Sequence, residues 1–191
     1  MKKIICLYGQ PGCGKTTQSD LLAAEFGFSQ FGMGDRLREE IASGSILGQK
    51  IKPHVDAGVL IPDDLMAEII KEAGQDAGEV GLIFDGFPRM TSQAAMLDEI
   101  LAGLGLKVDA FVYLHLSAED ALARIKSRAA LAGGGREDDT DETAIKNRFG
   151  VFEKQSVPLL DLYRDRGLLQ EVDGSLPITE VYSLVKKSLG L

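Results

Sequence analysis

The sequence predicts an α/β fold in which a parallel sheet of about five strands is flanked by helices. Short apolar runs alternate with helical patterns along the chain, which is typical of parallel strands joined by helices. The first strand and helix are separated by the phosphate-loop pattern G-x-x-x-x-G-K-[ST], formed by Gly9, Gly14, Lys15 and Thr16. Glycines in such a loop let backbone N–H groups face a polyphosphate. We therefore expect a sheet of the P-loop NTPase type that binds a nucleoside triphosphate.

The first strand and helix are the most clearly marked elements. The apolar run Ile4-Ile5-Cys6-Leu7 predicts a strand over 3–8, and an amphipathic pattern after the loop predicts a helix over 15–26. Further apolar runs bounded by glycine or polar residues predict the other strands of the sheet. These strands are expected at 28–31, 82–85, 111–116 and 168–172.

The remaining core helices follow from helical periodicity, and two of them carry signals at their N-termini. Asp63 and Asp64 follow Pro62, and acids in a first turn interact favourably with the helix dipole. Ser117 and Asp120 form a capping pair at the start of another helix. The helices are expected at 63–73, 92–102, 118–130, 142–166 and 178–189.

Two segments interrupt the alternation of strands and helices. Residues 32–61 contain two short helical patterns, separated at Ser43-Gly44-Ser45 and ended by Gly58, and predict a helical insertion at the carboxyl edge of the sheet. Residues 127–139 are rich in glycine and charge, which fits either a flexible surface loop or, as we expect, a short lid that excludes water. The chain is thus expected to be a single domain, 1–191, with a core of 1–31, 62–126 and 140–191.

Composition narrows the function classes. Hydrophobic residues make up 45% and charged residues 26% of the chain, as in a globular protein with a packed core. A net charge of −8 argues against nucleic acid as a partner, because phosphate backbones bind basic surfaces. Cys6 and Cys13 are too few for a disulfide framework, and no apolar run reaches the roughly 18 residues of a membrane span. We expect a cytoplasmic protein without a nucleic-acid or membrane partner.

The strand predicted at 82–85 ends in Asp85, where an aspartate can hold magnesium beside the phosphate loop. The stretch Asp85-Gly86-Phe87-Pro88-Arg89 resembles the D-G-F-P-R signature of adenylate kinases and of their relatives, the UMP/CMP kinases. Five further segments resemble motifs of this family and occur in its order: 9–17 (G-x-P-G-x-G-K-x-T), 34–38 (G-D-x-L-R), 58–63 (G-x-L-V-P-D), 136–139 (R-x-D-D) and 172–174 (V/I-D-G). The resemblance extends over nearly the whole chain.

The resemblance implies an adenylate kinase with a short lid, which transfers a phosphoryl group from Mg·ATP to AMP and gives two ADP. It also implies a monomer with Mg²⁺ as cofactor and, since the lid has no cysteine quartet, without structural zinc. A UMP/CMP kinase with the same mechanism is an alternative, because Gly32-Met33 replaces the family's Ser-Thr and removes a hydroxyl near the acceptor base. Gln93 favours adenine, although it could also be an exposed residue of its helix. A second alternative is a regulatory protein that binds nucleotides without turnover.

The resemblance further implies roles for six arginines. Arg38 and Arg89 would hold the monophosphate, Arg128 and Arg136 the triphosphate, and Arg124 and Arg148 the transferred phosphoryl group. A guanidinium group suits this task because it stays charged and binds phosphate oxygens in pairs. The separation of Arg136 and Arg148 is one residue longer than the family's usual spacing.

The site residues expected from the motifs fall into four groups. Catalysis is assigned to Lys15, Arg89, Arg124 and Arg148. ATP binding is assigned to Gly12, Cys13, Gly14, Lys15, Thr16, Thr17, Arg128, Arg136 and Leu176. AMP binding is assigned to Met33, Arg38, Val59, Leu60, Ile61, Gly86, Phe87, Pro88, Arg89 and Gln93. Magnesium is assigned to Thr16, Thr17 and Asp85; Lys15-Thr16-Thr17 replaces the family's Lys-Gly-Thr, so which threonine meets the metal is open.

Overall fold

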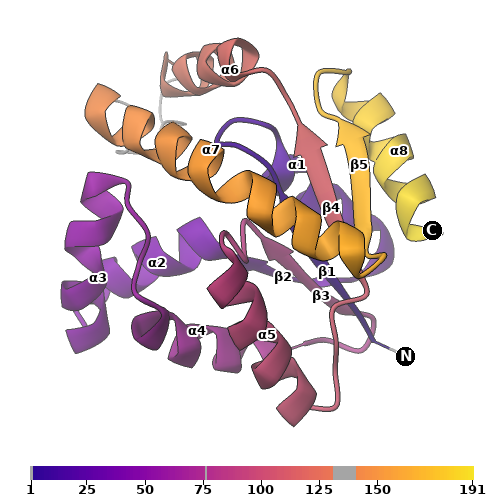
Figure 1. Ribbon diagram of the computed structural model, residues 1–191, viewed down its shortest axis with the longest axis horizontal. Helices are drawn as coiled ribbons and strands as arrows, with labels where there is room; N and C mark the ends of the chain where they lie inside the picture. Colours follow the sequence, from indigo (N-terminus) through magenta and orange to yellow (C-terminus); the bar gives the residue numbers. More distant parts are fainter. Residues whose placement is uncertain (1, 76, 131–140) are drawn as a thin grey trace.

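Five parallel strands form one sheet in the computed structural model, which describes residues 2–75, 77–130 and 141–191 (Figure 1). The strand order is β2-β3-β1-β4-β5, so the first strand of the sequence lies in the middle. The strands are β1 (Lys3–Tyr8), β2 (Ser29–Gly32), β3 (Gly81–Asp85), β4 (Ala110–His115) and β5 (Leu169–Asp173).

Helices cover both faces of this sheet (Figure 1). The described helices are α1 (Lys15–Phe26), α2 (Met33–Ala42), α3 (Ile46–Ala57), α4 (Asp63–Gln75), α5 (Thr91–Gly103), α6 (Ala118–Ala130), α7 (Glu142–Asp165) and α8 (Ile178–Leu189). Helices α4, α5 and α7 pack on one face, and α1 and α8 pack on the other. Among the described helices, none combines the length and the apolar character needed to cross a membrane.

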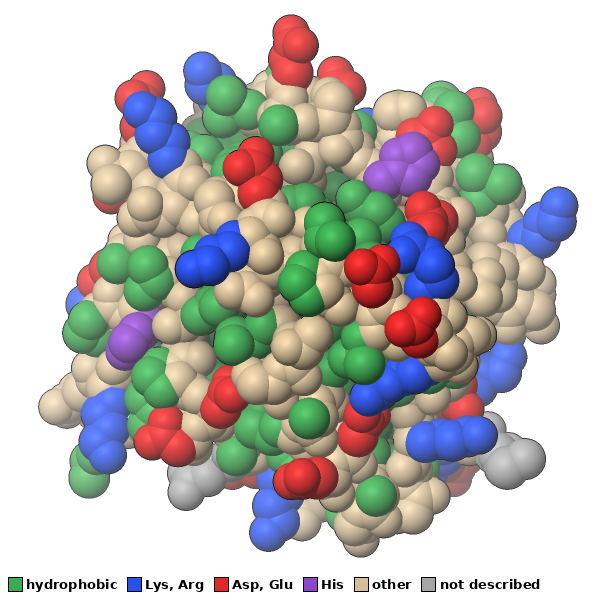
Figure 2. Space-filling model, viewed as in Figure 1, with side chains coloured by type: hydrophobic (Ala, Val, Ile, Leu, Met, Phe, Trp, Pro, Cys, Tyr) green, Lys and Arg blue, Asp and Glu red, His purple; other side chains and the backbone are tan. Residues whose placement is uncertain are grey.

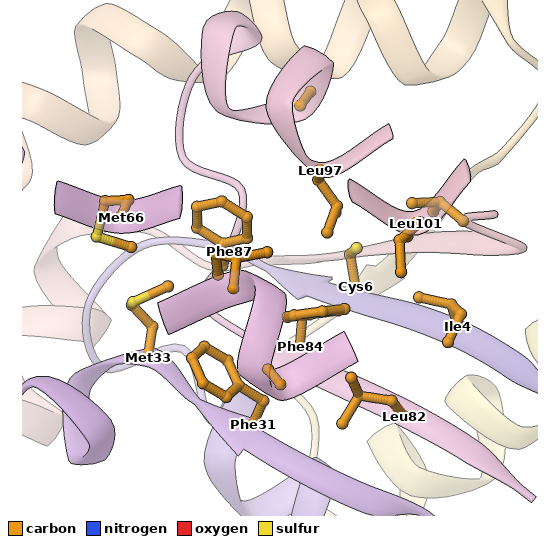
Figure 3. Packing of buried hydrophobic residues seen from close by; sticks show 14 of the residues in the cluster. Ile4, Cys6, Phe31, Met33, Met66, Leu82, Phe84, Phe87, Leu97 and Leu101 are labelled. Carbon is orange, nitrogen blue, oxygen red and sulfur yellow. The ribbon is translucent and has the colours of Figure 1, made fainter. Parts of the chain in front are cut away.

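The core follows from the alternation of side chains along each strand. In β1, Ile4 and Cys6 belong to the cluster beneath α4, α5 and α7, whereas Ile5 and Leu7 belong to the cluster beneath α1 and α8. All four side chains are fully buried. Figure 3 shows the first cluster, in which Phe84 of β3 lies among side chains from several elements. A strand that is buried on both faces reads as a continuous apolar run, which is why the sequence pattern identified it.

The strand register places three connections at one edge of the sheet. Leu7 of β1 and Gly32 of β2 both pair with Asp85, so β1, β2 and β3 end side by side at their carboxyl ends. The loop to α1 follows β1, and the segment with α2 and α3 follows β2. Ligands of open parallel sheets bind in this region, beyond the carboxyl ends of the strands.

Helices α2 and α3 lie in the segment 32–61, where the sequence predicts a helical insertion. Ser45 separates them, and its hydroxyl accepts a hydrogen bond from the backbone N–H of Gly48 at 2.8 Å, which caps α3. Gly58 follows α3 in a left-handed conformation (φ 66°), as a helix C-terminus favours. Asn147 of α7 donates from Nδ2 to the carbonyl oxygen of Ala57 at 2.8 Å, so the end of the insertion is tied to α7.

The structure confirms the predicted fold class, and the predicted elements match within one or two residues at their ends. The capping pair is also present, since the hydroxyl of Ser117 accepts from the backbone N–H of Asp120 at 3.0 Å. The predicted lid at 127–139 lies for the most part outside the described residues, and residues 127–130 form the last turn of α6. The division into core, insertion and lid therefore stays a prediction.

Candidate active site

A pocket of about 630 Å³ opens at the carboxyl edge of the sheet. Its walls come from the phosphate loop and α1, the segment after α3, the end of β3, helices α6 and α7, and the segment between β5 and α8. This volume lies within the range that small-molecule sites usually have. Most of the residues predicted from the motifs meet in this one pocket.

The phosphate loop needs glycine at two of its turns. Gly9 and Gly12 have φ angles of 147° and 86°, which side chains rarely adopt. A Cβ at Gly9 would lie 2.5 Å from the carbonyl oxygen of Leu114, and one at Gly12 would lie 2.6 Å from that of Ala121. The loop therefore packs directly on neighbouring backbone. Helix α1 begins after Gly14 without a side-chain cap, so its first N–H groups can bind an anion.

Lys15 and Gln10 are fixed by hydrogen bonds at this loop. The ammonium group of Lys15 donates to the carbonyl oxygens of Gly9 at 2.8 Å and of Gln10 at 3.2 Å. The side chain of Gln10 is buried, and its Nε2 donates to the carbonyl oxygens of Leu116 at 2.6 Å and of Ser117 at 2.7 Å. Sequence reasoning missed Gln10, because it stands at one of the variable positions of the motif. It anchors the loop to the segment after β4.

Thr16 and Asp85 are in direct contact. The hydroxyl of Thr16 donates to Oδ2 of Asp85 at 2.5 Å, and Asp85 is only 8% exposed. Thr17 also lines the pocket but is exposed. Hydroxyl and carboxylate oxygens are the ligands that Mg²⁺ prefers, and Mg²⁺ usually needs only one or two from the protein. Of the three predicted magnesium residues, Thr16 and Asp85 therefore fit the ion together.

Four of the six predicted arginines line the pocket: Arg89, Arg124, Arg128 and Arg148. They come from the end of β3, from α6 and from α7, so three separate segments bring positive charge to one place. The Nε of Arg89 donates to the carbonyl oxygen of Gly86 at 2.9 Å, which orients its guanidinium group. Together with Lys15, these side chains give the pocket the charge that a polyphosphate requires.

The other two arginines are placed differently. Arg38 forms an ion pair with Asp35 one turn earlier on α2, and its side chain is not part of the pocket wall. Asp35 itself lines the pocket. Arg136 lies outside the described residues.

The residues predicted for AMP divide into pocket wall and supporting core. Val59, Leu60 and Gly86 line the pocket. Ile61, Phe87 and Pro88 are buried, and a cis peptide bond joins Phe87 to Pro88.

Met33 is 2% exposed and belongs to the apolar cluster, where Figure 3 shows it near Phe31 and Phe87. Its side chain is not part of the pocket wall. The substitution that suggested a pyrimidine acceptor is therefore placed in the core.

Gln93 is buried rather than exposed on α5. It is 2% exposed, and its Oε1 accepts a hydrogen bond from the backbone N–H of Arg89 at 2.8 Å. This bond uses the oxygen of the Gln93 amide and not its Nε2. Gln93 is not part of the pocket wall, and the bond to the backbone of Arg89 connects it to that wall.

The segment from Gly174 to Ile178 closes the pocket on the other side of the phosphate loop. Leu176 lines the pocket as predicted, and Gly174, Ser175 and Ile178 join it. The hydroxyl and backbone N–H of Ser175 donate to Asp173, and these bonds lower the pKa of that carboxyl group. Sequence reasoning recognised the V/I-D-G motif but missed that the following turn forms a continuous wall.

Comparisons with known proteins agree with this geometry. The sequence profile of the adenylate kinase family matches residues 7–168. The chain is 38% identical over 187 residues to the adenylate kinase of Thermus thermophilus, with 98% of this chain and 97% of the relative covered. It is 39% identical over 191 residues to that of Deinococcus deserti (98% and 96% covered) and 35% identical over 207 residues to that of Archaeoglobus fulgidus (95% of each).

Proposed function

The chain belongs to the adenylate kinase family, and we propose that the pocket at the carboxyl edge of its sheet carries out the family's reaction. That reaction is the reversible transfer of a phosphoryl group from ATP to AMP, which gives two ADP. The chain is thus a phosphotransferase with a phosphate group as acceptor. One observation carries the assignment of the pocket. The glycine-rich phosphate loop with Lys15 lines the same pocket as four arginines from three other segments.

The triphosphate is proposed to lie over the phosphate loop. Backbone N–H groups from Gly12 to Thr17 would bind its phosphate oxygens. The ammonium group of Lys15 would leave the carbonyl oxygens of the loop and bind phosphate oxygens instead. Arg124, Arg128 and Arg148 would neutralise the charge that spreads over the transferred group. Thr16 and Asp85 would hold magnesium. When bound, the ion would supply positive charge that offsets the negative charge of the phosphates.

The monophosphate is proposed to lie between the insertion and the end of β3. Arg89 lines the pocket after β3, and Val59 and Leu60 line it after α3. Arg38 would join Arg89 on the phosphate after leaving Asp35. The Nε2 of Gln93 is the amide atom left to meet the base, since its Oε1 is taken by Arg89.

Catalysis in this arrangement rests on positioning and on charge neutralisation. The phosphate oxygen of AMP is itself the nucleophile, so no general base on the protein is needed. A bound pair of nucleotides reacts faster because the in-line geometry is already set. The segment 127–139, with Arg136, is proposed to close over the site and exclude water.

We also infer a cytoplasmic monomer without nucleic-acid or membrane partners. Positively and negatively charged side chains are interspersed on the face that Figure 2 shows, without one large basic area. Both cysteines are buried and unpaired, as a reducing compartment favours.

Coupled turnover with Mg·ATP and a panel of acceptors tests the proposal. Wild-type protein is expected to use AMP far better than UMP, CMP, GMP or dTMP. Lys15→Ala is expected to lower kcat/KM by about 10²–10³, because a preorganised charge at the transferred group is lost. Lys126→Ala is the matched control, since Lys126 is an exposed lysine of α6 outside the pocket wall. A pyrimidine preference would overturn the substrate, and full activity of Lys15→Ala would overturn the site.

A further inference from the structure

Gln18 is a buried amide at the pocket that the reaction described above does not use. It belongs to the first turns of α1, lines the pocket and is 2% exposed. Its Nε2 donates to the carbonyl oxygen of Ile178 at 3.3 Å, where α8 begins. Its Oε1 is buried and has no hydrogen-bond partner in the structure.

An unpaired buried acceptor lowers stability, because the oxygen has lost its water without gaining a donor. An apolar side chain of similar shape would fill the same space without this cost. Packing alone therefore does not explain an amide at this position. The contact that only the amide provides is the bond to Ile178.

That bond holds one end of the segment from Gly174 to Ile178. The other end is fixed at Gly174, whose N–H donates to the carbonyl oxygen of His115 at 2.8 Å. A Cβ at Gly174 would lie 2.9 Å from that same oxygen and 3.4 Å from the carbonyl oxygen of Cys13, so the segment lies directly against the phosphate loop. Between the two anchors, Leu176 and Pro177 line the pocket.

We propose that Gln18 is a positioning residue for the donor nucleotide, through its hold on the segment 174–178. Under the proposed function, on which this inference rests, the segment carries Leu176, which is assigned to ATP binding, and the N-terminus of α1 would bind the phosphates. Gln18 belongs to α1 and bonds to Ile178, so it would hold this wall at a fixed distance from the phosphate site.

The interface between α1 and α8 offers a built-in comparison. Farther along it, the hydroxyl of Tyr182 donates to Glu25 at 2.9 Å, and the carbonyl oxygen of Leu21 lies 3.1 Å from the same hydroxyl. These contacts also join α1 to α8, but Tyr182 is not part of the pocket wall. If Gln18 had a purely structural role, substitutions of Gln18 and of Tyr182 would have the same kind of effect, on stability and not on ATP binding.

The test compares Gln18→Met with Tyr182→Phe. Gln18→Met removes both the oxygen and the nitrogen of the side-chain amide at similar volume. We expect a Tm equal to or above that of the wild type, a KM for ATP raised about fivefold, and an unchanged KM for AMP. Tyr182→Phe is expected to lower Tm and to leave the KM for ATP unchanged. Calorimetric titration of ATP onto each protein measures the same difference without turnover.

Several outcomes would overturn the proposal. One is a Gln18→Met protein with lowered Tm and unchanged ATP affinity, and another is an equal rise in KM for both nucleotides. Failure of both Gln18→Met and Gln18→Leu to fold would also overturn it, because the amide would then serve stability. Failure of the proposed function looks different: the wild-type protein would then not turn over ATP and AMP at all.

Discussion

Thr16 and Thr17 are adjacent in the sequence, but their hydroxyl groups have different surroundings. Thr16 donates to Asp85 at 2.5 Å, whereas Thr17 is exposed and makes no comparable contact with that carboxylate. The motif left open which threonine meets magnesium, since both can occupy a first helical turn. The register of β1 and β3 places Asp85 opposite Leu7, just before the loop, where its carboxylate accepts from Thr16.

Thr16→Val is therefore expected to weaken the use of magnesium, and Thr17→Val is its matched control. Removing a metal ligand or its orienting group usually costs 10- to 100-fold in metal affinity or activity. We expect the Mg²⁺ concentration for half-maximal turnover to rise at least about tenfold in Thr16→Val and to stay near the wild-type value in Thr17→Val. A magnesium titration of the coupled assay measures both. The reverse order of effects would assign the metal to Thr17.

Single residues also show where sequence reasoning reaches its limit. The arginines near the pocket could be predicted, because Arg89 belongs to the D-G-F-P-R signature and the other three stand at positions where the resembled family binds phosphates. The burial of Met33 and Gln93 could not, because it depends on which face of α2 and α5 packs on the sheet. No sequence pattern identifies Gln18 as part of the site, since its hydrogen bond ends at a carbonyl group of α8.

At the scale of elements, the sequence predicts most starts and ends. The caps at Ser45 and Ser117 and the left-handed Gly58 are local devices, so they can be read from a few neighbouring residues. Contacts between elements are not local. The pairing of α1 with α8, which lie near opposite ends of the chain, includes contacts of Tyr182 and Lys186 with Glu25.

The α1–α8 contact is expected to make stability sensitive to alkaline pH. Burial and the hydrogen bond to Glu25 raise the pKa of Tyr182 to about 12, from about 10 in an unfolded chain. Because the folded state keeps this proton longer, the stabilisation is complete below about pH 10 and is lost as the pH rises through 12.

Urea unfolding of the wild type and of Tyr182→Phe between pH 9 and pH 12 measures this effect. The wild-type free energy of unfolding is expected to fall more steeply, since the other tyrosines titrate in both proteins. Parallel curves for the two proteins would contradict the assignment.

At the scale of the whole molecule, the end of the insertion is in direct contact with α7 beside the pocket. The amide of Asn147 donates to the carbonyl oxygen of Ala57, and a Cβ at Gly58 would lie 2.7 Å from the carbonyl oxygen of Ala144. Val59 and Leu60 follow directly and line the pocket. The contact with α7 therefore sets how far this wall lies from Arg148. The sequence predicted the insertion but not this contact, because the two segments are far apart in the chain.

Asn147→Ala is expected to raise the KM for AMP a few-fold and to leave the KM for ATP unchanged. The lost hydrogen bond ends at the wall proposed for the acceptor and is worth about 1 kcal/mol. Lys146→Ala, an exposed neighbour on α7, serves as the control. Initial rates with each nucleotide varied in turn give both constants. A rise for ATP alone would place the acceptor elsewhere.

The central position of β1 has a consequence for how the protein is made. β1 leaves the ribosome before every other strand, yet its two neighbours are complete only after Gly81–Asp85 and Ala110–His115 have been synthesised. Until then, the apolar run 4–7 of β1 has no partner strand, and such a segment is prone to aggregation in a nascent chain. Lys2 and Lys3 directly precede it and supply the flanking charge that opposes self-association. We therefore expect these two lysines to oppose self-association of the nascent chain until the sheet can close around its first strand.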